Sequence, residues 1–132
     1  MKFPIEQSLD CPPFGKHSVA FNRQEDDPKY NLPGMPEKLA ASAHEDVVSH
    51  WPAVWDAARP KIEQLLTEYE YGKTLQELLS DPKNSLNVFI MVPEGKERYR
   101  LDVFIDIGLK MGSHVFGVEF EELVAKQATA TF

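Results

Sequence analysis

The segment 98–107 alternates between apolar and polar side chains, and this pattern constrains the fold more than any other feature of the chain. Its apolar positions are Tyr99, Leu101, Val103, Ile105 and Ile107. Because successive side chains of a strand point to opposite faces of a sheet, the segment is predicted to be a strand with one buried face. Similar alternation appears at 114–121, and 86–92 is rich in β-branched and aromatic residues. We therefore expect an antiparallel three-stranded meander, which the tail 129–132 extends if it is also a strand.

The lengths of the connections set the expected register of this meander. A turn at 93–96 and a loop at 108–113 join the three strands. The expected pairs are Ile90 with Tyr99, Val88 with Leu101, Val103 with Val118, and Leu101 with Phe120. All of these apolar residues then share one face, which is predicted to be buried.

A helix is predicted between Trp51 and Tyr69, because apolar side chains recur there at steps of three and four. The stripe consists of Trp55, Ala58, Ile62, Leu65, Leu66 and Tyr69. Pro60 removes one hydrogen bond, but the stripe keeps its phase across it, so we expect one long kinked helix. Thr74 and Glu77 have capping-box spacing and predict a short helix that ends near Asp81. Residues 37–41 are good helix formers, and Ser42 with Glu45 indicates a fresh helix start.

The first 36 residues contain more than half of the ten prolines and are predicted to be extended or looped, with one short strand at 18–22. The chain is thus expected to be a single domain, 1–132, with a Pro-rich extended segment at 1–36, helices at 37–81 and an antiparallel sheet at 82–132. The predicted fold class is α+β: an antiparallel meander with one long kinked helix and one short helix packed on one face.

The composition indicates the cellular compartment of the protein and the class of partner that it binds. The formal net charge of −7 disfavours nucleic acid, because phosphate binding requires a basic face, and it favours a basic protein partner. The single cysteine, Cys11, cannot form an internal disulfide, and no apolar run is long enough for a membrane helix or resembles a secretory signal. We therefore expect a cytoplasmic protein with no membrane association.

The residues that most often carry chemistry form no recognisable motif. The four histidines, His17, His44, His50 and His114, match no metal-ligand spacing, so neither a metal site nor a cofactor is expected. His114 is in phase with the buried strand positions and is expected to be hydrogen-bonded locally. Cys11 lacks a neighbouring base, and the glycines at 108 and 112 belong to a hairpin loop. Trp51 and Trp55 are expected to lie in the core; if exposed, either would anchor an interface.

The polar face of the predicted sheet is the candidate binding site. Its residues are Asp102, Phe104, Asp106, Glu119 and Glu121. The register places Arg100 opposite Glu121 as an ion pair, and Asp102 opposite Glu119 as a like-charge pair that costs stability. Asp102 and Asp106, with Glu119 and Glu121 on the next strand, could also pair as catalytic carboxylates, because residues on one face lie within reach of each other.

The segment from Trp51 to Glu70, followed by a meander that ends at 114–121, resembles small bacterial α+β immunity proteins, which neutralise the toxin of a neighbouring cell. That resemblance implies a non-enzymatic, acidic domain that binds a basic toxin. Two alternatives remain at this stage. One is a small-molecule enzyme with a pocket between helix and sheet, containing His50 or His114 and a carboxylate; the other is a structural or assembly subunit.

Overall fold

The computed structural model describes residues 2–30, 33–92, 98–109 and 112–132, which form a mixed α+β fold. Two strands, β1 (Ile5–Asp10) and β2 (Lys16–Arg23), precede three helices, α1 (Glu37–Ser49), α2 (Trp51–Glu68) and α3 (Leu75–Ser80). Four strands follow: β3 (Ser85–Met91), β4 (Arg100–Leu109), β5 (Gly112–Glu121) and β6 (Val124–Thr131). Pro28–Tyr30 adds one 3-10 turn. The α+β class expected from the sequence is confirmed.

The sheet is larger than the expected meander. Its six strands are hydrogen-bonded in chain order, from β1 at one edge to β6 at the other. All neighbours are antiparallel except β2 and β3, which are parallel, so the expectation of a wholly antiparallel sheet was wrong. The three helices lie between β2 and β3 in the chain, and they provide the long crossover that a parallel pair requires.

The Pro-rich segment contributes two strands rather than one. Its prolines lie outside both strands: Pro4 precedes β1, and Pro12 and Pro13 form the turn before β2. Ile5 and Leu9 of β1 are half-buried, and Val19 and Phe21 of β2 are fully buried. The N-terminal segment is therefore part of the sheet and of the core.

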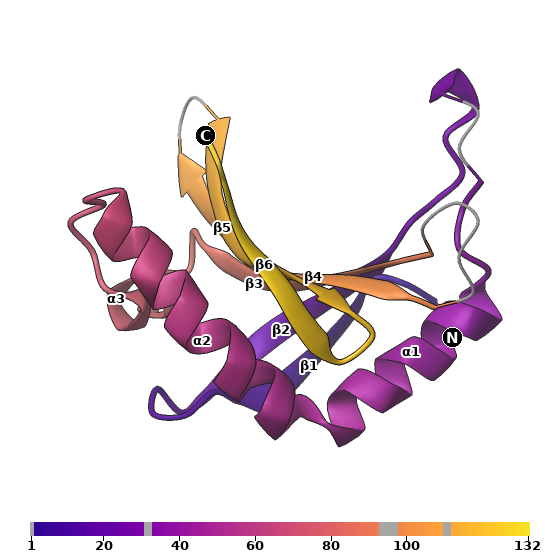
Figure 1. Ribbon diagram of the computed structural model, residues 1–132, viewed down its shortest axis with the longest axis horizontal. Coiled ribbons are helices and arrows are strands. Elements are labelled where there is room, and N and C mark those ends of the chain that lie inside the picture. The colour runs from indigo at the N-terminus through magenta and orange to yellow at the C-terminus, as the bar shows by residue number, and fades with distance from the viewer. Residues whose placement is uncertain (1, 31–32, 93–97, 110–111) are drawn as a thin grey trace.

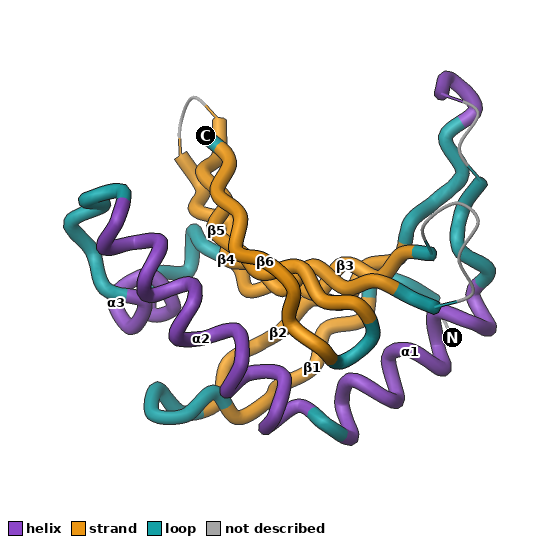
Figure 2. The backbone as a smooth tube through the Cα atoms, viewed as in Figure 1, coloured by secondary structure: helices purple, strands orange, loops and turns teal. Residues whose placement is uncertain are grey.

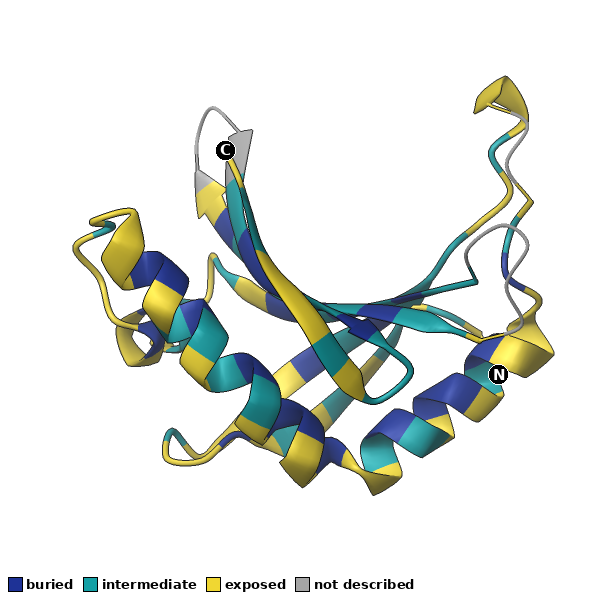
Figure 3. Cartoon of the chain, in the orientation of Figure 1, coloured by how far each residue is buried: buried dark blue, intermediate teal, exposed yellow. Residues whose placement is uncertain are grey.

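The helices pack on a single side of the sheet, and the other side carries no helix among the described residues (Figures 1 and 2). The buried residues of α1 and α2 lie on the sides of the helices that face the strands (Figure 3). α2 runs as one helix through Pro60, as expected. α1 begins at Glu37 and continues past Ser42, so the predicted fresh helix start at Ser42 was wrong. Thr74 and Glu77 form the predicted capping box of α3.

The second hairpin has the predicted register, whereas the first is displaced by two residues. Val103 lies opposite Val118 and Leu101 opposite Phe120, as expected. Ile90, however, lies opposite Leu101 rather than Tyr99, and Val88 lies opposite Val103. A shift of two residues keeps every side chain on its face, so the apolar pattern alone cannot detect it. The expected turn at 93–96 lies outside the described residues. The expected loop at 108–113 is shorter, because β4 runs to Leu109 and β5 begins at Gly112.

Two tryptophans of α2 form hydrogen bonds to the N-terminal hairpin. Trp51 and Trp55 are buried, and their rings stack with centroids 6.0 Å apart. The indole Nε1 of Trp51 donates to the carbonyl oxygen of Asp10 at 2.8 Å, and that of Trp55 donates to Pro12 at 2.7 Å. Both residues thus belong to the core, as expected, and their polar atoms are satisfied.

Candidate functional site

The side chains on the helix-free side of the sheet form the open sheet face, which is the candidate functional site. Strand alternation defines it: Leu101, Val103 and Ile105 are buried beneath the helices, and the residues between them point the other way. We define the open sheet face by the half-buried residues Asn87, Phe89, Arg100, Asp102, Phe104, Asp106, Val115, Glu119 and Glu121. All five candidate residues from the sequence lie on it, on the neighbouring strands β4 and β5.

The register brings these candidates together in adjacent rows. Asp102 lies opposite Glu119, as the sequence predicted, and Phe104 lies opposite Gly117. On its other side Asp102 neighbours Phe89 of β3. Asp102 therefore has Phe89 beside it on β3 and Phe104 two residues further along β4, an arrangement that suits a partner with both apolar and cationic groups.

Arg100, the first residue of β4, is the basic residue among those that define this face. Its guanidinium Nη2 lies 3.8 Å from a carboxylate oxygen of Asp102 and 3.7 Å from one of Glu119. The expected ion pair with Glu121, which lies directly opposite, is replaced by this diagonal contact with Glu119. Gln127 of β6 donates to the other carboxylate oxygen of Glu119 at 2.6 Å. Glu119 is thus held by two neighbours.

Asp102 is the least well satisfied of these carboxylates. Its Oδ1 atom is buried and has no hydrogen-bond partner in the protein. Burial raises the pKa of Asp102, Arg100 opposes that effect, and the negative charge of Glu119 adds to it. The ionised form of Asp102 is therefore disfavoured by the fold. A carboxylate in this condition is more common at functional sites than on ordinary surfaces.

Phe104 approaches β5 closely because residue 117 is glycine. A Cβ atom on Gly117 would lie 2.6 Å from Cβ of Phe104 and 2.9 Å from the carbonyl oxygen of Val103. Gly117 is buried, and no larger residue fits there without moving the strands apart. The place of Phe104 on the face therefore depends on this glycine.

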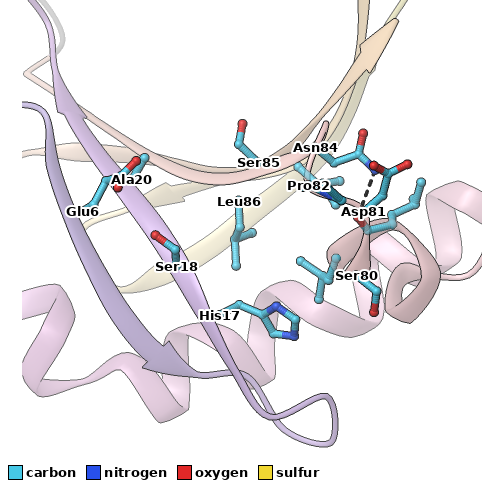
Figure 4. A pocket seen from close by; sticks show the side chains of 13 residues that line it. Glu6, His17, Ser18, Ala20, Ser80, Asp81, Pro82, Asn84, Ser85 and Leu86 are labelled. Carbon is cyan, nitrogen blue, oxygen red and sulfur yellow. Dashed lines mark hydrogen bonds between the residues drawn. The ribbon is translucent and has the colours of Figure 1, made fainter.

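A separate cavity, which we call the β2–β3 slot, opens where β2 and β3 diverge. Hydrogen-bonded pairing of the two strands begins at Val19 and Leu86, and the residues before them separate. The slot has a volume of about 460 Å³. It is lined by Glu6, His17, Ser18, Ala20, Leu78, Leu79, Ser80, Asp81, Pro82, Asn84, Ser85, Leu86 and Ile105. Figure 4 shows Glu6 and Asp81 at opposite ends of the slot, with Leu86 between them.

Sequence reasoning missed the slot. Its residues come from β1 to β4, from α3 and from the turn after α3, and their meeting depends on the parallel pairing that no local pattern signals. The enzyme alternative required His50 or His114 in a pocket, whereas the histidine in the slot is His17. Its Nε2 lies 3.0 Å from the carbonyl oxygen of Phe14 and must donate to it. Nδ1 of a neutral His17 is therefore left as an acceptor.

The other histidines lie in three separate places. His44 of α1 is buried, and its Nε2 contacts Oε1 of Gln7 at 3.0 Å. His50 is exposed between α1 and α2, 3.5 Å from the carboxylate of Asp46. His114 packs against Tyr71 and Phe132, and its Nδ1 has no partner, so the expected local hydrogen bond is not found at that atom.

Cys11 is buried, and burial next to Asp10 raises the pKa of its thiol to about 11. Its Sγ contacts the carbonyl oxygen of Leu9 at 3.6 Å. A thiol with a raised pKa is a poor nucleophile at neutral pH, so Cys11 is a core residue rather than a reactive one.

Neither a protein-family model, nor a curated protein, nor a solved structure matches the chain. Within the described residues, no helix is long and apolar enough to cross a membrane. In the same residues, no three His, Cys, Asp or Glu side chains are grouped so that they would hold a metal ion.

Proposed function

We propose that this protein is a non-enzymatic, acidic protein-binding domain whose open sheet face holds a basic protein. The observation that carries the proposal is Asp102, a carboxylate that the fold disfavours, placed between Phe89 and Glu119 on a face that no described helix covers. A cationic side chain from a partner would relieve the repulsion between Asp102 and Glu119. The half-buried ring of Phe104 supplies apolar contact area beside it.

The charges of the face fit this partner. Of its charged side chains, Asp102, Asp106, Glu119 and Glu121 are acidic, and only Arg100 is basic. The whole chain also carries a net charge of −7. Such a field attracts a basic partner over long range and speeds its association at low salt. The resemblance to immunity proteins suggests that the partner is a toxin, which the domain neutralises in the cytoplasm.

The test is affinity capture from the native host with matched variants. The site variant is Glu119→Gln with Glu121→Gln; the control is Glu45→Gln with Asp56→Asn, which removes the same charge from exposed positions on α1 and α2. We expect the wild type and the control to retain a stoichiometric basic protein that high salt releases. The site variant should lose it.

Two results would refute the proposal. Equal capture by the site and control variants would move the interface away from the open sheet face. The absence of any basic partner would favour an alternative class. An assembly subunit would instead self-associate, for which exposed Val124 and Phe132, at the two ends of β6, would be the contacts; light scattering of the purified protein distinguishes this.

A further inference from the structure

We propose that the β2–β3 slot is a binding site for a short aliphatic diamine. This site adjoins the open sheet face, since Ser85 of its lining lies opposite Asp106, but it shares no residue with that face and does not depend on the function proposed there. Its volume of about 460 Å³ falls in the range of small-molecule pockets. The slot exists because β2 and β3 pair only from Val19 and Leu86 onwards.

The charges around the slot select a cation. Two carboxylates, Glu6 and Asp81, belong to its lining, and neither lysine nor arginine does. Asp81 uses its Oδ1 atom to accept from the backbone N–H of Lys83 at 3.0 Å, so its second oxygen remains for a ligand. An anionic ligand would meet negative charge at both ends of the slot and is disfavoured.

The arrangement of the lining selects two cationic groups joined by an apolar chain. Glu6 and Asp81 lie at opposite ends of the slot, and the side chain of Leu86 lies between them (Figure 4). Leu79, which is half-buried, and Pro82, which is exposed, provide accessible apolar surface in the lining. Methylene groups of a diamine would cover this surface while each ammonium group reaches one carboxylate.

Hydroxyl and imidazole acceptors complete the site. Ser18, Ser80 and Ser85 line the slot, and each hydroxyl can accept from an ammonium group. The carbonyl oxygen of Phe14 takes the Nε2 hydrogen of His17, which leaves Nδ1 of the neutral ring as a further acceptor. An ammonium group with three hydrogens requires several acceptors in addition to a carboxylate, and the slot provides them.

The experiment is a titration of the purified chain followed by amide NMR shifts, with diamines of three to six methylene groups as probes. Two carboxylates at fixed positions should give an affinity that passes through a maximum as the diamine lengthens. Butylamine, butane-1,4-diol and succinate serve as the one-charge, uncharged and reversed-charge comparisons. We expect shifts at Ser18, Ser85 and Leu86, with weaker binding of butylamine and none of succinate.

Variants locate the binding. Glu6→Gln and Asp81→Asn should each weaken the best diamine by roughly three- to fivefold, the effect of a partly exposed ion pair. Asn at 81 keeps an oxygen for the N–H of Lys83, so the turn is retained. Asp10→Asn, on the same strand as Glu6 but outside the slot lining, is the matched control and should leave the affinity unchanged.

Three results would overturn the proposal. These are a flat or steadily rising affinity with chain length, binding of the diol or of succinate equal to that of the diamine, and equal weakening by Asp10→Asn. Equal weakening by Asp10→Asn would mean that the net negative charge of the protein attracts the diamine non-specifically. Failure here leaves the open sheet face untouched, because the capture experiment uses residues of β4 and β5 only.

Discussion

Trp55 of α2 donates its indole N–H to the carbonyl oxygen of Pro12, 2.7 Å away in the turn between β1 and β2. The bond joins the longest helix to the N-terminal hairpin and satisfies a polar atom inside the core. Trp55→Phe removes the donor and part of the ring. We expect a loss of about 1–3 kcal/mol in the free energy of unfolding, because the substitution removes this hydrogen bond and leaves a void where part of the buried indole ring was. Urea denaturation measures it, and Tyr30→Phe, at an exposed position, should be near neutral.

His44 predicts how stability changes with pH. Burial lowers the pKa of His44 from 6.5, although Glu45 opposes the effect. The folded state therefore takes up this proton less readily than the unfolded state. The contribution is fully present above pH 6.5 and declines as the pH falls towards the lower pKa of the folded state. We expect His44→Leu to reduce the slope of the unfolding free energy against pH below pH 6.5, as measured by urea denaturation at a series of pH values.

Asp102→Asn is expected to stabilise the protein near pH 7. The fold raises the pKa of Asp102 and so opposes its ionised form. Removing the like-charge contact with Glu119 should raise the free energy of unfolding by roughly 0.2–1 kcal/mol. The gain should shrink at acid pH, because the wild-type carboxyl is then protonated. Asp106→Asn, which removes the same charge from the same strand, is the control. A loss of stability at pH 7 in Asp102→Asn would show that its contact with Arg100 outweighs the burial.

Gly117→Ala tests the close approach of β4 and β5. The added Cβ would meet Cβ of Phe104 and the carbonyl oxygen of Val103 within 3 Å. We expect a loss of about 1–3 kcal/mol, typical of overpacking, in chemical denaturation. Thr129→Ala, at the β6 position opposite Gly117, should cost less. A neutral Gly117→Ala would mean that the two strands separate easily and that the position of Phe104 is not fixed by this residue.

The second hairpin could be predicted from the sequence, because alternation fixes which face each residue occupies and a short loop fixes the register. All five candidate residues therefore share one face, as predicted. The first hairpin could not be predicted as well, because a displacement of two residues leaves the alternation of Val88 and Ile90 unchanged. Strand β1 was missed because Gln7 interrupts its apolar positions and prolines flank it. The parallel pairing of β2 with β3, and with it the slot, depends on a tertiary contact that local sequence does not encode.

The diagonal contact of Arg100 shows a further limit of prediction from register. The residue directly opposite is Glu121, but the guanidinium reaches Glu119 and Asp102 instead. A long side chain can reach diagonal neighbours on a twisted sheet. The register therefore shows which carboxylates are within reach of Arg100, but not which of them it contacts.

The parallel pairing of β2 with β3 is expected to form late in folding. Val19 meets Leu86 only after the three helices have brought β3 back alongside β2, and contacts so distant in sequence form slowly. Until then the backbone N–H and C=O groups on one edge of β3 are unpaired. The side chains of Leu86, Val88 and Ile90, which are buried in the folded protein, lie on the same strand. A chain that loses its first two strands, through proteolysis or an internal start of translation, would keep that edge permanently exposed and would tend to pair with other copies and aggregate.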